Sequence, residues 1–278
     1  MKIGAHISTA QPFSEAVNRA QNIGCECMQI FANPPQRWNP VKITEHEIER
    51  FIELNNQHNI KPIIIHGIYL INLASDNPFY YQASIKSLID DMQKAKKLGA
   101  IGVNFHVGST KGNDFSKSLI KIKDAINKIF ESSPEGPFLV LENSAGAGNI
   151  IGDTLDELAQ IIKAVDSPRI KVLIDTAHAF ESGYDLKTLT DLENFIDKFD
   201  KEIGLDRLIG FHLNDSKTAL DSKRDRHADI GYGDIGKDVF KELVNHPKLK
   251  NMFGILETPQ DKVSWKNQIE LLKGMRKS

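Results

Sequence analysis

The stretch HLNDSKTALDSKRDRHADIG, at residues 212–231, is rich in side chains that bind metal ions or protons. It follows an apolar run typical of a buried strand, and its two histidines stand near its two ends. Asp225 and His227 are two positions apart, so in extended backbone their side chains point the same way. Neutral imidazole and carboxylate groups are ligands for Zn²⁺, Mn²⁺ or Fe²⁺. The stretch therefore indicates a metal site at a strand end; the alternative is a solvated polar loop.

Similar residues end several other apolar runs. A single buried histidine at a strand end is more often a hydrogen-bonded core residue than a ligand. Here, however, four carboxylates converge with several imidazoles, and such carboxylates repel one another unless cations neutralise them. The set is too large for one ion, so we expect a cluster of two or three. The candidate ligands are His66, His106, Glu142, Asp175, His178, His212, Asp225, His227 and Glu257.

Four further histidines are not in this set. His6 ends the first apolar run and is expected to be a neighbour of the ligands. His46, His58 and His246 lie in or beside helical patterns, and we expect them on the solvated surface.

Eight strand–helix units must position these residues. The predicted strands are 2–8, 27–32, 62–67, 102–108, 138–144, 170–178, 208–215 and 253–259, and their continuous apolar runs suit parallel strands buried on both faces. The predicted helices are 12–23, 43–56, 81–98, 118–130, 154–165, 185–203, 237–246 and 265–276, with possible capping boxes at Thr44–Glu47 and Thr154–Glu157. This alternation predicts an α/β fold, a (β/α)8 TIM barrel formed by a single domain over residues 1–278. An open doubly wound sheet is the alternative. In such a barrel, chemistry collects at the carboxyl ends of the strands.

The composition is that of an ordinary globular protein, with 278 residues, 40% of them hydrophobic and 26% charged. No apolar run approaches the roughly 18 residues of a membrane helix, and no signal peptide is visible. Cys25 and Cys27 make a poor disulfide, and two reduced thiols favour a cytoplasmic location. The net charge of −2 argues against a generally basic nucleic-acid-binding protein, but not against a local site made positive by bound metal.

Four stretches resemble the endonuclease IV family of apurinic/apyrimidinic (AP) endonucleases. They are GAHIS at 4–8, HGIYLINLAS at 66–75, VLIDTAHAFESGYD at 172–185 and HLNDSKTALDSKRDRHADIGYGDIG at 212–236, and the similarity extends to ETP at 257–259. The resemblance implies a TIM barrel with three zinc ions that acts on double-stranded DNA, and we expect this chain to be a monomer. Such an enzyme cuts the backbone 5′ to an abasic site, leaves a 3′-hydroxyl and a 5′-deoxyribose phosphate, and also trims blocked 3′ ends.

Carried over by position, the resemblance implies three sets of zinc ligands. His66, His106 and Glu142 would hold one ion; Glu142 would bridge to a second, held also by Asp175, His212 and Glu257; and His178, Asp225 and His227 would hold the third. Zinc lowers the pKa of a water ligand to about 7, so the implied nucleophile is a metal-activated hydroxide. Glu142 and Glu257 are both candidates for the proton acceptor, and the sequence does not choose between them.

The sequence departs from the family's pattern at three places. STAQPF stands where a Gly pair usually follows the first strand, and Ala177 stands where the family often has Cys, which removes no ligand. The loop after the second strand, which enters DNA in the family, reads NPPQRW with its Arg displaced. Arg37, Trp38 and Tyr69 are the predicted DNA contacts, and plain packing is the alternative for Trp38.

Two other functions remain open at this point. One is a metal-dependent sugar isomerase on the same kind of barrel, although rim residues suited to wedging DNA apart favour a nuclease. The other is a non-catalytic lesion-binding protein, which would not need a metal-activated water.

Overall fold

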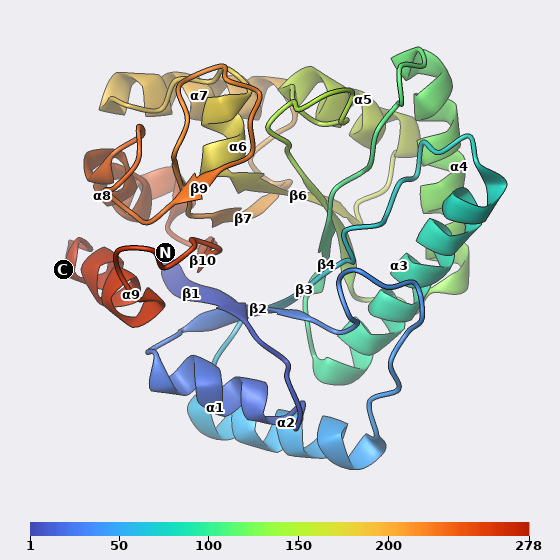
Figure 1. Cartoon of the computed structure of the whole chain (residues 1–278), viewed down its shortest axis with the longest axis horizontal. Helices are drawn as coiled ribbons and strands as arrows, with labels where there is room; N and C mark the ends of the chain where they lie inside the picture. Colours follow the sequence, from blue (N-terminus) through green and yellow to red (C-terminus); the bar gives the residue numbers. More distant parts are fainter. Residues whose placement is uncertain (278) are drawn as a thin grey trace.

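Eight parallel strands close into a barrel, with helices around its outside, in the computed structural model, which describes residues 1–277 (Figure 1). The barrel order is β1-β10-β7-β6-β5-β4-β3-β2. Its strands are β1 (Lys2–Ile7), β2 (Cys27–Phe31), β3 (Ile63–His66), β4 (Gly102–Phe105), β5 (Phe138–Glu142), β6 (Ile170–Asp175), β7 (Leu208–His212) and β10 (Phe253–Leu256). The predicted TIM barrel is therefore confirmed, and the open sheet is wrong. The last residue of the predicted domain, 278, lies outside the described residues.

The helices follow the strands and pack on their outer faces. They are α1 (Glu15–Asn22), α2 (Glu45–His58), α3 (Pro78–Leu98), α4 (Phe115–Ser132), α5 (Leu155–Val165), α6 (Thr176–Glu181), α7 (Leu189–Glu202), α8 (Lys237–Asn245), a 3-10 turn (Pro247–Leu249) and α9 (Trp265–Gly274). Each long helix buries an apolar stripe against the barrel, as Ile48, Phe51 and Leu54 of α2 do. None of the helices within residues 1–277 combines the length and apolarity needed to cross a membrane.

Several strands end earlier than the sequence predicted. β6 stops at Asp175 because the Asp175 carboxylate accepts a hydrogen bond from the backbone N–H of His178, in the first turn of α6. The predicted strand 170–178 therefore merged a strand with a short helix. The polar stretch 212–231 also contains a small antiparallel pair, β8 (Asp215–Ser216) and β9 (His227–Ala228). This pair returns the chain to the barrel rim.

Only one of the two hydrogen bonds of each predicted capping box is present. Thr44 and Thr154 accept hydrogen bonds from the N–H groups of Glu47 and Glu157. The glutamate side chains turn elsewhere, however: Glu47 accepts from the backbone N–H of Ser14, and Glu157 from that of Gly152. A complete capping box forms instead at Thr188 and Asp191, at the start of α7.

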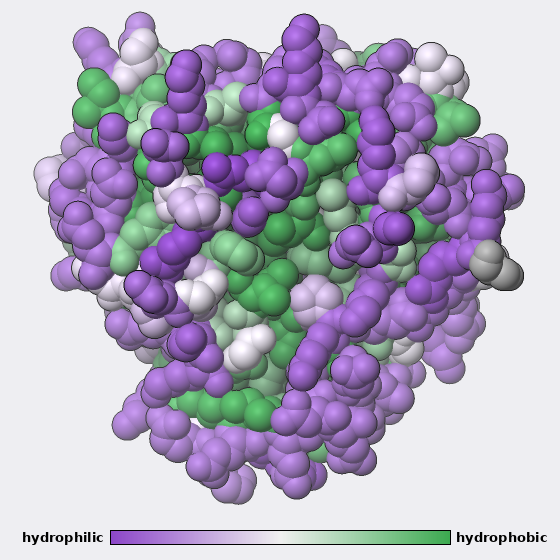
Figure 2. All heavy atoms as spheres, turned by 180° about the vertical axis from the view of Figure 1, so that it is seen from behind, coloured by the Kyte–Doolittle hydropathy of each residue, from purple (hydrophilic) through white to green (hydrophobic). Residues whose placement is uncertain are grey.

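The interior is apolar, and the surface is mainly polar. On the face opposite to that of Figure 1, hydrophilic residues cover the periphery and hydrophobic residues show in the recessed middle (Figure 2). Cys25 and Cys27 are free and buried, as predicted. The expected solvated position of His246 is wrong: its side chain is buried where α8 ends, and its Nε2 lies 3.0 Å from Oε1 of Glu193 on α7.

Candidate metal centre

The structure brings the nine candidate ligands together at the carboxyl end of the barrel. Four of them are the last residues of their strands: His66 of β3, Glu142 of β5, Asp175 of β6 and His212 of β7. His106 and Glu257 directly follow β4 and β10, His178 lies in α6, Asp225 precedes β9 and His227 begins it. Parallel strands of one barrel all end at the same rim, which places residues distant in sequence in contact.

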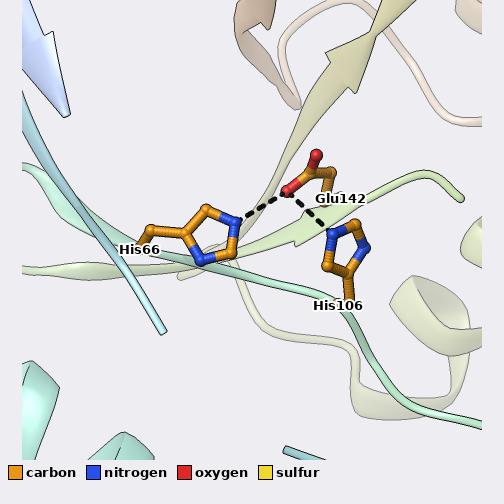
Figure 3. Close-up of side chains that lie close together, drawn as sticks. All are labelled: His66, His106 and Glu142. Atoms are coloured by element: carbon orange, nitrogen blue, oxygen red, sulfur yellow. Dashed lines mark ion pairs between the residues drawn. The ribbon is translucent and has the colours of Figure 1, made fainter. Parts of the chain in front are cut away.

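His66, His106 and Glu142 form one group of potential ligands (Figure 3). One carboxylate oxygen of Glu142, Oε2, lies 3.4 Å from Nε2 of His66 and 3.7 Å from Nε2 of His106. The three donor atoms face a common point, with separations below 4.8 Å.

Two further groups adjoin the first. Glu142 also belongs to a group with Asp175, His212 and Glu257, and Asp175 belongs to another with His178 and His227. The three groups therefore form one continuous cluster, with Glu142 and Asp175 as the shared carboxylates.

Asp225 lies at the solvent side of this cluster. Its Oδ2 is 3.4 Å from Nε2 of His178, and its Oδ1 is 3.4 Å from Nε2 of His227. The D-R-H spacing thus directs Asp225 and His227 to the same place, as the sequence predicted. The side chain of His227 is only 17% exposed, whereas that of Asp225 is 57% exposed, so the solvated-loop alternative still describes Asp225 in part.

The electrostatics of the cluster match a cation site. Burial alone would raise the pKa of the Glu142 carboxyl, but His212 and His106 hold it well below its usual range. Burial likewise opposes the charged form of His212, yet Glu142 and Glu257 raise the pKa of this imidazole to about 9. Without a cation, protonated imidazoles are thus needed to offset the buried carboxylates. Divalent ions would do the same, and the imidazole–carboxylate donor set suits zinc.

His6 is a neighbour of this cluster, as expected. Its Nδ1 lies 2.6 Å from Oε1 of Glu257, and burial lowers the pKa of its imidazole. Its buried Nε2 has no hydrogen-bond partner within residues 1–277.

Amide side chains at the barrel rim orient the cluster, and they were not among the predicted site residues. Asn104 donates to Oε2 of Glu142 at 2.5 Å, and Asn214 donates to Oδ2 of Asp175 at 2.6 Å. Gln29 of β2 donates to Oε1 of Glu257 at 2.7 Å. Buried polar residues inside apolar runs such as CMQIF and GVNF were the signal that could have revealed them.

Glu181 was also missed, and it holds the segment that carries Asp225 and His227. Its buried Oε1 accepts hydrogen bonds from the hydroxyls of Ser216 (2.7 Å) and Thr218 (3.2 Å) and from the backbone N–H of Arg226 (3.1 Å). Burial raises the pKa of the Glu181 carboxyl. One helical turn after His178, Glu181 thus ties α6 to the polar segment.

The three predicted DNA contacts lie on loops beside the cluster. Tyr69 is largely exposed, and its ring lies 5.9 Å from that of His66 and 5.3 Å from that of Phe31. Arg37 is exposed, whereas Trp38 is half-buried and packs against the core. The packing alternative for Trp38 is therefore correct for part of its ring. A cavity of about 740 Å³ lies between Tyr69, His227 and Glu257.

Comparison with known proteins places this fold and site in a class. The family described as "Xylose isomerase-like TIM barrel" matches residues 17–275. A Halothermothrix orenii protein named "Probable endonuclease 4" is 40% identical over 94% of each chain. "Apurinic-apyrimidinic endonuclease 1" of Saccharomyces cerevisiae is 36% identical over 98% of this chain and 75% of its own.

The structural comparison agrees. The crystal structure of endonuclease IV from Thermus thermophilus aligns with a TM-score of 0.89 and 32% identity, covering 99% of this chain and 98% of that one. The chain belongs to the endonuclease IV family, within the xylose isomerase-like TIM barrels.

Proposed function

We propose that this chain hydrolyses the DNA backbone on the 5′ side of abasic sites, leaving a 3′-hydroxyl and a 5′-deoxyribose phosphate. The observation that carries the proposal is the cluster of three ligand groups joined by Glu142 and Asp175. Near full-length similarity to a protein named as an apurinic-apyrimidinic endonuclease supports the same reading. We extend the proposal to trimming blocked 3′ ends and to a monomer acting on double-stranded DNA.

We assign three zinc ions to the cluster. The first would lie among His66, His106 and Glu142, and the second among Glu142, Asp175, His212 and Glu257. The third would lie among His178, Asp225 and His227, with Asp175 beside it. When bound, the ions would supply positive charge for the phosphoryl oxygens and acidify a water ligand.

The protein's own contribution is positioning and proton transfer. Glu142 is wholly buried, with one oxygen against His212 and the other accepting from Asn104, so it serves to hold the centre together. The side chain of Glu257 is 17% exposed and lines the open cavity, where attacking water and substrate must arrive. Of the two candidates, Glu257 is therefore the better placed proton acceptor. Asn214 fixes it by accepting the backbone N–H of Glu257 at 2.9 Å.

Two features favour a nuclease over a sugar isomerase on this fold. The cluster is rich in imidazoles, with five among its nine candidate ligands, whereas the isomerase alternative predicts a site that relies on carboxylates and a catalytic Lys or His. The rim also carries the exposed ring of Tyr69 and the exposed Arg37, which suit contacts with stacked bases.

A duplex containing one tetrahydrofuran abasic analogue tests the proposal. We expect incision 5′ to the analogue, with a product that a polymerase extends directly from its 3′-hydroxyl. Binding without incision would favour the lesion-binding alternative. If the protein neither binds nor cuts the duplex but isomerises an aldose, the isomerase alternative is favoured.

Elemental analysis of protein purified without chelators tests the zinc assignment. Two to three zinc equivalents per chain are expected, and a metal content below one equivalent in active protein would overturn the cluster. Sedimentation at micromolar concentration tests the monomer.

A further inference from the structure

A group of exposed aromatic side chains lies beside the metal cluster, where the β2–α2 loop meets the start of α3. Phe79 is 63% exposed and Tyr80 48% exposed, and their ring centroids are 5.4 Å apart. The ring of Trp38 stacks on Tyr80 at 6.3 Å, with an interplanar angle of 28°. We call Trp38, Phe79 and Tyr80 the aromatic ledge. Exposed apolar side chains that are contiguous in this way mark interaction surfaces.

The aromatic ledge is continuous with the metal cluster. A cavity of about 650 Å³ is lined both by His106 and Asp225 and by Trp38 and Tyr80. Trp38 is also a wall of a second cavity, of about 570 Å³, that Phe79 lines. A substrate seated at the cluster therefore has an open path onto the ledge.

The start of α3 and the β2–α2 loop, which carry the ledge, are both held in place by hydrogen bonds. Asn77 caps α3 by accepting hydrogen bonds from the N–H groups of Phe79 and Tyr80, which fixes the first turn. The loop is tied to the same helix through Asn33, which donates to Asp90 at 2.7 Å and Asp91 at 2.8 Å. The ledge is thus presented by a fixed loop and a fixed helix.

Three basic side chains that form no ion pair within residues 1–277 lie around the ledge, and the carboxylates of Asp90 and Asp225 line the same two cavities. Arg37 and Lys86 line the second cavity, and Lys111 lines the first. Within residues 1–277 none of the three forms an ion pair, whereas Lys94, on the same helix as Lys86, pairs with Asp90 at 2.7 Å. Free cations next to exposed rings complement a polyanion that also offers flat apolar surfaces.

We propose that the aromatic ledge, with Lys86 and Lys111, binds one arm of the DNA duplex that flanks the abasic site. This inference rests on the proposed function. The rings would pack on sugars and bases of that arm, and the lysines would neutralise its phosphates. The proposal adds α3 to the DNA-binding surface, beyond the loops that carry Arg37 and Tyr69.

Shortening the duplex from either side tests this. Binding of the metal-loaded protein is measured by fluorescence anisotropy, with duplexes that carry the abasic analogue and a non-cleavable linkage. For the parent, we expect shortening one of the two arms to weaken binding about tenfold, or ~1.4 kcal/mol. The double variant Phe79→Ala/Tyr80→Ala should bind the long duplex about tenfold more weakly than the parent. Shortening that same arm should then weaken its binding no further, whereas the effect of shortening the other arm should not change.

A matched control removes an exposed apolar side chain from another helix. Ile120 of α4 is 71% exposed, and Ile120→Ala should bind every duplex as the parent does. Lys86→Gln and Lys111→Gln should each reduce the slope of log affinity against log salt by about one. Thermal midpoints equal to that of the parent verify that the variants fold.

Three results would overturn the proposal. The first is an arm-length dependence that is identical in the parent and in the Phe79→Ala/Tyr80→Ala variant. The second is a salt slope unchanged by both lysine variants. The third is a concentration-dependent dimer of the parent that this double variant dissociates, since the ledge would then bind a second copy. If the parent fails to cleave abasic duplex but shows the arm dependence, the proposed function fails and the ledge stands.

Discussion

The imidazole of His212 and the carboxylate of Glu142 meet across the mouth of the barrel, with Nδ1 2.9 Å from Oε1, although β6 separates their strands. The other ring nitrogen of His212 faces Oε1 of Gln29 at 2.9 Å. Both nitrogens therefore face oxygen acceptors, which agrees with the raised pKa of this imidazole. Metal binding at Nδ1 or Nε2 would displace a proton from the ring, so loading of the centre should release protons.

Glu257→Gln should abolish most cleavage and leave the fold and DNA binding intact. The amide retains the shape of the side chain and one oxygen that can accept from Gln29, but it accepts no proton and is a poor metal ligand. We expect a loss of several orders of magnitude in the single-turnover rate of incision at saturating protein. A loss of less than about tenfold, roughly 1.4 kcal/mol, would make Glu257 peripheral.

Tyr69→Ala and Arg37→Ala should weaken productive binding of abasic duplex. Each side chain projects from a rim loop, and losing one stacking contact costs about 1–3 kcal/mol. The concentration of duplex that gives half-maximal cleavage should rise, and zinc content should not change. If both variants cut like the parent at physiological salt, the side chains that enter the DNA are not Tyr69 and Arg37.

Glu181→Ala should loosen the metal site formed by His178, Asp225 and His227. Without the carboxylate, the hydroxyls of Ser216 and Thr218 and the N–H of Arg226 lose their shared acceptor. We expect one zinc equivalent to pass to a colorimetric chelator at least about tenfold faster, the scale of outer-shell effects on metal affinity. Glu181→Gln keeps an acceptor oxygen and should lose much less.

Glu193→Ala is the matched control for this experiment. Glu193 also pairs with a buried side chain, His246, but on the outer helices α7 and α8. The rate of zinc release from this control should equal that of the parent. If Glu181→Ala also releases zinc at the parent's rate, the polar segment does not need Glu181 to keep its position.

Asp91→Asn should flatten the dependence of stability on pH. Burial, with Asp90 beside it, raises the pKa of the Asp91 carboxyl to about 7 from an ordinary 3.8. Because the folded state holds this proton more tightly than the unfolded state, the group contributes its full stabilisation below about pH 4. That stabilisation is lost as the pH rises through 7. The parent should therefore lose free energy of unfolding between pH 5 and pH 8 that the variant retains, by about 1 kcal/mol or more. Urea unfolding at both pH values, at one fixed zinc concentration, measures the difference; equal losses in the two proteins would contradict it.

The strands and most candidate ligands were predictable because each carries a local signal. An apolar run followed by His or Glu is readable at His66, His106 and Glu142, and the rules of parallel barrels bring those ends together. The D-R-H spacing likewise predicted that the side chains of Asp225 and His227 lie together. In each case the information lies within a few residues of sequence.

The contacts of the supporting residues were not predictable, because they exist only across the fold. Gln29 contacts Glu257 from a strand more than two hundred positions earlier, and nothing in CMQIF indicates its partner. Glu181 looks like an exposed helix residue until β8 and β9 fold over it. His246 was misplaced for a related reason: a polar residue beside a helix is usually solvated, but here two helices close around it.

The shared carboxylates mean that ions bound at the proposed metal centre would link the ends of several barrel strands. Glu142 and Asp175 each belong to two ligand groups, and the remaining ligands come from segments as far apart as residues 66 and 257. The full set of candidate ligands comes together only when both halves of the chain are folded, so the proposed ions would bind the closed barrel better than any open form. By linkage, every ion held strengthens the closed state. Full metal occupancy would therefore indicate that the barrel is closed, with the first strand, β1, paired with the last, β10.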